Sequence, residues 1–323
     1  MRAVVCESYG PPSSLSILEL PDPVAGPDDA VVAVRAAAIN FPDLLIMENL
    51  YQVSIPTPFT PGSEFAGEVI SIGANVTNVR VGDQVMGGSF VGSFAEQVCV
   101  AASSLKPIPV GLTLEQAAAF SVTYRTAYHA LVTVGELKAD DWVVVLGAAG
   151  GVGTACVDLA TRLGARVIAV AASDERLEIC AKLGAVAGIN YTTESLKERI
   201  KAITGSGADL IIDPVGGPYA EEAFRGIAWG GVFVVVGFAQ GDIPRIPLNL
   251  VLLKGGIIKG FEIRTVSEHL PNEVAEGDAA LNAMVSQGVV PHISDVFSLD
   301  QAREALQFVA DRKSTGKVVI RMQ

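Results

Sequence analysis

Residues 142–170 restrict the fold of this chain more than any other stretch, because they contain one complete β-α-β unit. The apolar run Trp142–Leu146 is long enough for a buried strand and too short for a helix. A glycine-rich turn follows, then apolar residues at helical spacing that end at Gly164, and then a second apolar run, Val167–Val170. This order predicts a parallel sheet covered by helices.

The spacing of the glycines in this turn is typical of a dinucleotide-binding loop. In that fingerprint the third glycine follows the second by three residues, as Gly153 follows Gly150. A side chain at Gly150 or Gly151 would keep the backbone away from a pyrophosphate, and the following helix N-terminus offers free amides and a partial positive charge. A plain glycine turn is the alternative, but the flanking strands and helix favour the dinucleotide site. The loop residues predicted to bind the cofactor are Ala149, Gly150, Gly151, Val152 and Gly153.

The end of the second strand predicts which nicotinamide cofactor binds. Proteins that prefer NAD place a carboxylate there, whereas this chain has Ala171 and Ala172. Ser173 and Arg176 follow, a hydroxyl and a guanidinium that suit a 2′-phosphate. We therefore predict NADPH. Two points stay open: neighbouring carboxylates would oppose a phosphate if they point inward, and Arg176 could simply pair with them.

The bulk properties of the chain exclude several classes of partner. The net charge of −12 over 323 residues disfavours nucleic acid and anionic membrane surfaces as main partners. No run approaches 18 apolar residues, so we expect no membrane span, and no export signal is visible. The four cysteines, Cys6, Cys99, Cys156 and Cys180, are far apart and are predicted to be reduced thiols of a cytoplasmic protein.

The patterning predicts two domains. Short strand-like runs separated by Gly and Pro turns predict a partly open β-barrel at the N-terminus. From Trp142 to about Phe261, strands and helices alternate, including strand-like runs at Ile243–Leu248 and Ile257–Ile263, and this alternation predicts a doubly wound sheet. The final run Lys317–Arg321 is predicted to return to the first domain. The expected boundaries are residues 1–122 with 264–323 for the first domain, and 123–263 for the second.

Seven motifs, in order along the whole chain, carry a resemblance to a known family. They are Ala37–Asp43, Pro61–Gly67, Val81–Val85, Gly92–Glu96, Ala148–Gly153, Ile189–Tyr191 and Asp213–Gly217. With these motifs the chain resembles a zinc-independent member of the medium-chain dehydrogenase/reductase superfamily, in the quinone oxidoreductase (zeta-crystallin-like) group. The resemblance implies an α/β protein with a GroES-like, partly open β-barrel as its catalytic domain and a doubly wound Rossmann domain that binds NADP.

The departures from zinc alcohol dehydrogenases predict that no metal is used. Those relatives place a Cys where Asn40 stands, a His where Ser63 stands, and a second Cys near Ser121 or Val122. A catalytic zinc needs three nitrogen, sulfur or carboxylate ligands, which these residues do not supply. The three histidines, His129, His269 and His292, are scattered, and we expect them to be surface or helix residues.

Without a Lewis acid, an acceptor that disperses charge itself is the best substrate, namely a quinone or an α,β-unsaturated carbonyl. The resemblance implies that Asn40 and Tyr51 line the nicotinamide cleft of the family. Tyr51 could donate a hydrogen bond to the oxygen that gains charge, or its ring could pack under a loop with the hydroxyl in water. Asp43 is expected to orient the backbone or Asn40. The candidate catalytic residues are therefore Tyr51, Asn40 and Asp43.

The resemblance also assigns residues to the cofactor. Thr126 and Ala127 are expected beside the nicotinamide ribose and phosphates, Tyr191 near the adenosine phosphate, and Arg312 reaching back from the C-terminal segment. An exposed charge at a helix end is the alternative for Arg312. The cofactor-binding residues implied in this way are Asn40, Thr126, Ala127, Tyr191, Val215, Gly237, Phe238, Ala239 and Arg312.

The family further implies a homodimer formed through a strand edge near Ile243–Leu248 or Ile257–Ile263, where exposed β-character permits pairing. Two other functions stay open. One is an enoyl-thioester (acyl-CoA) double-bond reductase of the same superfamily. Such an enzyme needs a basic surface patch for the thioester carrier, and the acidic composition of this chain gives little support for one. The other is a non-catalytic NADPH-binding protein with a structural role.

Overall fold

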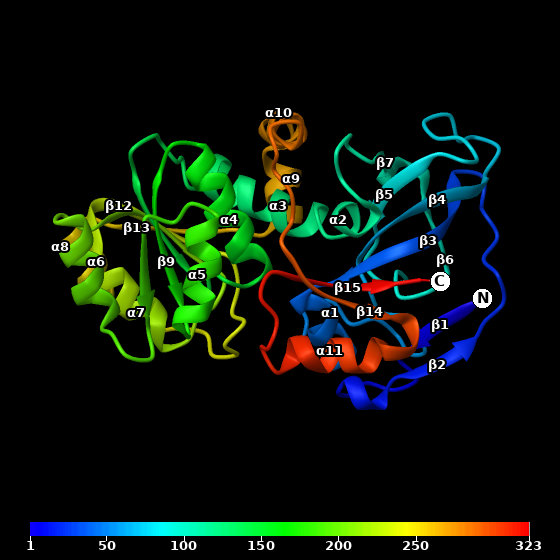
Figure 1. The fold of residues 1–323 in the computed structure, drawn as a ribbon, viewed down its shortest axis with the longest axis horizontal. Helices are drawn as coiled ribbons and strands as arrows, with labels where there is room; N and C mark the ends of the chain where they lie inside the picture. Colours follow the sequence, from blue (N-terminus) through cyan, green and yellow to red (C-terminus); the bar gives the residue numbers. More distant parts are fainter. Residues whose placement is uncertain (323) are drawn as a thin grey trace. The chain divides into compact units, whose positions relative to one another are not determined.

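The computed structural model describes residues 1–322, which divide into two compact units (Figure 1). Unit 1 comprises Met1–Val122 and the C-terminal segment from Val290, and unit 2 comprises Thr123–Val289. The first boundary coincides with the expected one. The second falls at Val289 rather than at residue 263, because Asp278 of the intervening segment accepts a hydrogen bond from Arg125 Nε at 2.7 Å.

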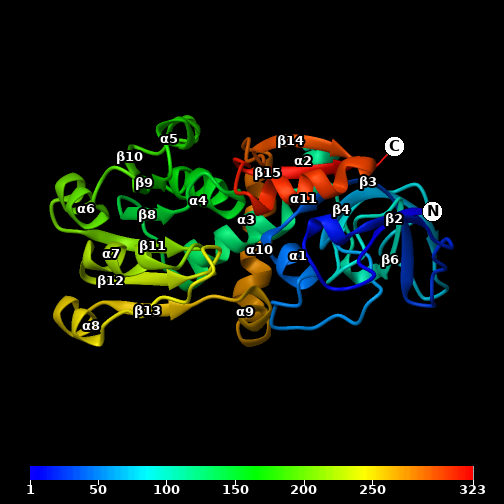
Figure 2. The same ribbon diagram turned by 90° about the horizontal axis from the view of Figure 1, so that it is seen from below.

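Unit 2 contains six parallel strands in the order β10-β9-β8-β11-β12-β13, which Figure 2 shows side by side. This is the doubly wound order predicted from the sequence, with the strands before and after the glycine turn paired at the centre. The strands are β8 (Trp142–Leu146), β9 (Arg166–Ala171), β10 (Ala187–Asn190), β11 (Ala208–Asp213), β12 (Ile227–Val235) and β13 (Ile257–Gly260).

Helices connect these strands and cover the sheet, whose core includes the fully buried rings of Phe224 and Phe233. The connecting helices are α4 (Gly151–Arg162), α5 (Asp174–Lys182), α6 (Leu196–Thr204), α7 (Pro218–Arg225) and α8 (Leu248–Lys254). The remaining helical segments are α3 (Ser121–Tyr128), which contains the division between the units, a π-helical segment (His129–Val134), α9 (Ile263–His269) and α10 (Pro271–Val285).

The predicted strand at Ile243–Leu248 is wrong. Residues 243–247 form no regular structure, and Leu248 begins α8. Pro244 and Pro247 explain the difference, because proline has no backbone N–H to donate to a ladder, and Pro247 sits at the cap position where the helix starts.

Unit 1 is built on a seven-stranded sheet in the order β14-β15-β3-β4-β5-β7, with β6 also paired to β3, and on the two-stranded sheet β1-β2. It confirms the predicted partly open β-barrel of the GroES-like domain. The strands are β1 (Arg2–Val5), β2 (Ser16–Glu19), β3 (Asp29–Ile39), β4 (Glu64–Ile72), β5 (Gln84–Gly88), β6 (Gln97–Ala101), β7 (Lys106–Pro107), β14 (Ile293–Ser298) and β15 (Lys317–Arg321).

Strand β15 returns to the N-terminal sheet as predicted and pairs antiparallel with β3, with Val318 opposite Ile39. This register brings the start of β15 to the end of β3. Phe65 and Phe94 are fully buried in the core of the unit. The helices of this unit are α1 (Phe41–Met47), α2 (Leu114–Ala118) and α11 (Ala302–Ala310), with 3-10 turns at Pro12–Ser14, Ala102–Ser104 and Leu299–Gln301. Across residues 1–322, no helix is long and apolar enough to span a membrane.

Candidate functional site

The glycine loop after β8 is shaped by close backbone contacts. Gly147 has a φ of +59°, a left-handed conformation that favours glycine, and a Cβ there would lie 2.6 Å from Val215 Cγ2. A Cβ at Gly153 would lie 2.2 Å from the Gly147 carbonyl oxygen. A Cβ at Gly150 would meet only that same oxygen, at 3.3 Å. Folding therefore requires glycine at 147 and 153, whereas a Cβ at Gly150 would require only a small shift of the Gly147 carbonyl.

Gly150 also occupies the N-cap position of α4, in an extended conformation. A twelve-residue helix that begins behind a cradle without side chains presents backbone amides and the positive end of its dipole to an anion. This geometry fits a pyrophosphate, as the sequence predicts.

The segment after β9 holds the candidate 2′-phosphate groups. Ser173 caps α5, and its Oγ accepts a hydrogen bond from the backbone N–H of Arg176 at 3.4 Å. The carboxylate of Asp174 accepts from Asn190 Nδ2 at 2.9 Å and is thus held against the neighbouring strand β10. Asp174 is exposed, and this bond directs one of its carboxylate oxygens toward β10. Tyr191, which follows β10, packs on Tyr219 with 4.3 Å between the ring centroids.

The ends of β11 and β12 are tied together by the loop that begins at Asp213. Its Oδ1 accepts from the backbone N–H groups of Val215 and Gly216, both at 2.8 Å. The Gly237 N–H donates to the Asp213 carbonyl, and the Ala239 N–H to the Pro214 carbonyl. The structure thus brings Val215 near Gly237 and Ala239, with the ring of Phe238 partly exposed beside them. Burial raises the pKa of Asp213.

Two further cofactor candidates of unit 2 lie on α3, where Ala127 is buried and Thr126 is half-buried. Arg312 belongs to unit 1 and follows α11 in a left-handed conformation, with a φ of +57°.

Unit 1 contains a buried polar cluster at the end of β3, which we call the Asn40 cluster. It consists of Asn40, Asp43, Ser63, Glu64 and Lys317. Lys317 is only 3 % exposed and Glu64 1 %, and their charged groups are 2.8 Å apart. The ammonium of Lys317 also donates to the carbonyl of Ile39 at 2.9 Å and to Asn40 Oδ1 at 2.6 Å. All three of its protons are therefore used.

The carboxamide of Asn40 is fully engaged inside the cluster. Its Oδ1 accepts from Lys317, and its Nδ2 donates to Glu64 Oε1 at 2.9 Å and to Ser63 Oγ at 3.2 Å. The second oxygen of Glu64 accepts from the backbone N–H of Val122 at 2.9 Å. These bonds fix the plane of the Asn40 amide and the place of the Ser63 hydroxyl.

Asp43 is the one carboxyl group of the cluster that no cation directly balances, because the charges of Glu64 and Lys317 offset each other. Its Oδ2 accepts from the backbone N–H of Asn40 at 2.8 Å, which fixes the start of α1 as the sequence suggests. Burial raises the pKa of Asp43 to about 7. The backbone N–H of Asn40, the Ser63 hydroxyl and Lys317 lower this pKa, and Glu64 raises it further.

Tyr51 is half-buried on the segment after α1, and its ring packs on Phe90 with 6.0 Å between the centroids at an interplanar angle of 53°. This arrangement gives the tyrosine an aromatic neighbour on one side. The ring thus packs against another residue while the side chain keeps some exposure. Tyr51 as a hydrogen-bond donor and Tyr51 as a packing residue both stay hypotheses.

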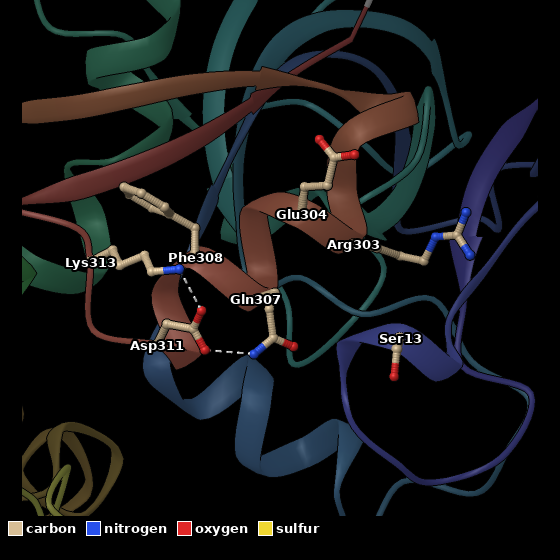
Figure 3. A pocket seen from close by; sticks show the side chains of 7 residues that line it. All are labelled: Ser13, Arg303, Glu304, Gln307, Phe308, Asp311 and Lys313. Carbon is tan, nitrogen blue, oxygen red and sulfur yellow. Dashed lines mark hydrogen bonds and ion pairs between the residues drawn. The ribbon is translucent and has the colours of Figure 1, made fainter.

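A surface hollow of about 460 Å³ lies elsewhere on unit 1, along α11 (Figure 3). In it, Asp311 binds Lys313 and Gln307, at 2.9 and 2.8 Å. The hollow is lined by Ser13, Arg303, Glu304, Gln307, Phe308, Asp311 and Lys313. None of the predicted site residues lines this hollow.

Sequence reasoning missed Glu64 and Lys317 as members of the site. The sequence signal for Lys317 was that it is a single cation at the start of a mainly apolar strand. If such a strand is buried, its ammonium group is buried as well and needs an acidic or polar partner. His129 lies in the π-helical segment, in agreement with the expectation of a surface or helix residue, and it is fully buried and contacts Thr133 and Asp278. Within residues 1–322, no group of three His, Cys, Asp or Glu side chains is placed to hold a metal ion.

Comparisons with known proteins agree with this architecture. The family model described as alcohol dehydrogenase GroES-like domain matches residues 26–110, and the model described as zinc-binding dehydrogenase matches residues 151–279. The chain is 39% identical over 328 residues to the quinone oxidoreductase-like protein 2 homolog of Nematostella vectensis, a match that covers 99% of this chain and 88% of the relative.

Solved structures of quinone oxidoreductases are similar to this chain in fold. The quinone oxidoreductase of Escherichia coli, solved in complex with NADPH, superposes with a TM-score of 0.92 at 26% identity, covering 99% of this chain and 100% of the other. The quinone oxidoreductase of Thermus thermophilus superposes with a TM-score of 0.86 at 33% identity, again covering 99% and 100% of the two chains.

Proposed function

This chain belongs to the zinc-independent, quinone oxidoreductase-like group of the medium-chain dehydrogenases/reductases, and we propose that it is an NADPH-dependent enzyme that reduces a quinone or an α,β-unsaturated carbonyl. When bound, NADPH supplies a hydride. The chain contributes a cradle for the pyrophosphate, groups for the 2′-phosphate, and a polar cluster for the acceptor.

The observation that carries this proposal is the content of the Asn40 cluster. The positions at which zinc relatives place a Cys and a His hold an amide and a hydroxyl, which are poor zinc ligands. A buried ammonium already donates to the amide oxygen. The Ser63 hydroxyl of this cluster can donate a hydrogen bond to an oxygen that gains charge, which suits an acceptor that delocalises charge over a conjugated system.

Three features support NADPH as the cofactor. The Gly150 cradle at the N-terminus of α4 suits a pyrophosphate. No carboxylate stands at Ala171 or Ala172, and Asp174 is engaged by Asn190. Ser173 is the N-cap of α5, and Arg176 lies in the first turn of this helix. A 2′-phosphate bound by these two residues would also meet the helix N-terminus. Similar enzymes have been solved with NADPH.

A panel of acceptors tests the function directly. We expect the purified chain to oxidise NADPH with 1,4-naphthoquinone or 2-cyclohexenone, and to leave crotonyl-CoA, an enoyl thioester, unreduced. The absorbance of the reduced nicotinamide reports the rate. Faster turnover of crotonyl-CoA would favour the enoyl-thioester reductase, and NADPH binding without turnover of any acceptor would favour the non-catalytic protein.

We also propose a homodimer formed through the open edge of β13. This strand pairs only with β12 in the described structure, and its Ile257 and Ile258 are 47% and 40% exposed. Leu252 and Leu253 of the adjacent helix α8 are 80% and 71% exposed. A second copy that pairs at this edge would cover these side chains. Sedimentation should show a dimer that Ile258→Lys converts to a monomer, and an unchanged mass would argue against this edge.

The proposed location is the cytoplasm. All four cysteines are free thiols, three of them buried, as expected in a reducing compartment.

A further inference from the structure

The hydrogen bonds of the Asn40 cluster leave one hydroxyl proton to be assigned. Asn40 uses both protons of its amide nitrogen within the cluster, on Glu64 and Ser63. The Ser63 oxygen thus accepts from Asn40, and its own proton takes no part in that bond. Ser63 is half-buried, whereas Asn40 and Glu64 are buried. Ser63 is therefore the member of the cluster whose proton can reach an acceptor.

A buried acid lies behind this hydroxyl. Asp43 is 1% exposed, and one of its oxygens, Oδ2, accepts from the Asn40 backbone. The other oxygen, Oδ1, is buried and has no hydrogen-bond partner among the described residues. Asn40 holds both groups, because its backbone N–H donates to Asp43 Oδ2 and its Nδ2 donates to Ser63 Oγ. The Ser63 hydroxyl also lowers the pKa of Asp43. Because a hydroxyl can rotate, Ser63 can accept a proton from Asp43 and donate its own elsewhere.

We propose that Ser63 donates the proton that a quinone or enone oxygen takes up on reduction, and that the carboxylic acid of Asp43 replaces this proton. The proposal rests on the proposed function and adds a proton donor to it. In these terms Ser63 is a catalytic residue, because it touches the reacting oxygen, and Asp43 is a positioning residue that acts through Ser63. Asn40 and Lys317 hold the serine in place.

The atoms balance over one turnover. Reduction of a quinone to a hydroquinone adds two electrons and two hydrogens, of which one hydrogen and both electrons arrive as the hydride from NADPH. The second hydrogen is the Ser63 hydroxyl proton, which forms a bond to the acceptor oxygen as the Oγ–H bond breaks. Asp43 transfers its proton to Ser63 Oγ, becomes a carboxylate, and regains a proton from water before the next turnover.

The burial of Asp43 and the groups around it determine the pH dependence. The groups that face it are Lys317 from β15, Glu64 and Ser63 at the start of β4, and the backbone of Asn40. Since burial raises the pKa of Asp43 to about 7, the acid is present below that pH and is lost above it. The rate should therefore fall as the pH rises through about 7, and the fall should depend on Asp43.

Five variants of the full-length chain test the proposal with 1,4-naphthoquinone as the acceptor. Ser63→Ala should lower kcat by about 100-fold or more, the usual contribution of a positioned general acid. Ser63→Thr, which keeps the hydroxyl, should restore most of the rate. Asp43→Asn should lower kcat and abolish its fall near pH 7, and the double variant with Ser63→Ala should be no slower than Ser63→Ala alone. Ser93→Ala is the matched control, because Ser93 Oγ is buried without a hydrogen-bond partner in the described residues.

The outcomes separate the proposal from the proposed function. Wild-type turnover with an unaffected Ser63→Ala variant would overturn the role of Ser63 and leave the function intact. A large loss in Tyr51→Phe with little loss in Ser63→Ala would assign the donor to Tyr51 instead. A pH profile that is unchanged in Asp43→Asn would remove Asp43 from the path. Unchanged NADPH binding, measured by its fluorescence, would show that a loss of rate in Ser63→Ala does not come from misfolding or from loss of the cofactor.

Discussion

The glycine loop of unit 2 and the Asn40 cluster of unit 1 are two sites built by different means. The loop is made of backbone, and its shape depends on missing side chains at Gly147 and Gly153, within a few residues of sequence. The Asn40 cluster is made of side chains, and Lys317 reaches Asn40 across 277 positions of the chain. The first site is thus encoded locally, and the second exists only after the strands have paired.

This difference predicts how each site fails. A backbone site fails by steric exclusion when a side chain is added. A buried side-chain cluster fails electrostatically when a member is removed, because a charge is left without its partner in a medium of low polarity. Four measurements test this contrast, from the largest expected effect to the smallest.

Removal of the buried cation should have the largest effect. Lys317→Met leaves the carboxylate of Glu64 buried without its counter-ion and should lower the free energy of unfolding by about 3–5 kcal/mol. The double variant Lys317→Met/Glu64→Gln should recover much of this loss, because it leaves no unpaired charge. Urea unfolding followed by circular dichroism measures both. A single variant as stable as wild type would mean that water reaches Glu64 and that the cluster is not an electrostatic unit.

The second prediction concerns pH. Burial raises the pKa of Asp43 to about 7, so the folded state holds a proton that the unfolded chain releases near pH 4. The unfolded state binds fewer protons between these values, and stability must fall as the pH rises from about 4 to 7, by at most about 4 kcal/mol from this group. Asp43→Asn should flatten this part of the stability profile. A slope in wild type that persists in the variant would assign it to other groups.

The contrast between the two sites also explains how much could be predicted from sequence. The strand Trp142–Leu146 and the glycine turn were predicted at their observed positions, because hydrophobic runs and glycine spacing act over a few residues. The return of Lys317–Arg321 to the first sheet was also predicted, from the pattern of the final apolar run. In contrast, the strand expected at Ile243–Leu248 fails because its two prolines remove ladder donors.

The membership of the Asn40 cluster could only partly be predicted. Asn40 and Asp43 were predicted because both lie in the motif Ala37–Asp43, one of the motifs that carry the family resemblance. Lys317 was missed because its contact with Glu64 depends on the register of β15 against β3, and no pattern within either strand shows that register. Backbone sites can thus be found from one segment, whereas a cluster of side chains requires the pairing of distant strands.

The third prediction separates two glycines of the same loop. Gly153→Ala places a Cβ 2.2 Å from the Gly147 carbonyl and should destabilise unit 2 by about 1–3 kcal/mol. Gly150→Ala has 3.3 Å to the same oxygen, so it should fold with little loss while NADPH affinity falls by about 10-fold or more, or about 1.4 kcal/mol. Tryptophan fluorescence reports the stability, since Trp142 and Trp229 both lie in unit 2. Unchanged NADPH affinity in Gly150→Ala would mean that the pyrophosphate lies elsewhere.

The smallest effect is expected for a single half-buried side chain. Arg176→Ala should weaken NADPH binding by about 10-fold, the lower end of the range for one hydrogen bond to a charged group, and should leave NADH affinity unchanged, because only NADPH carries the 2′-phosphate. Lys182→Ala is the control, since it removes a cation from the other end of the same helix. Fluorescence titration with both cofactors gives the two constants. Equal losses of affinity for NADPH and NADH would show that Arg176 supports the glycine loop and does not bind the 2′-phosphate. Cofactor binding in unit 2 would then depend on the backbone of that loop alone.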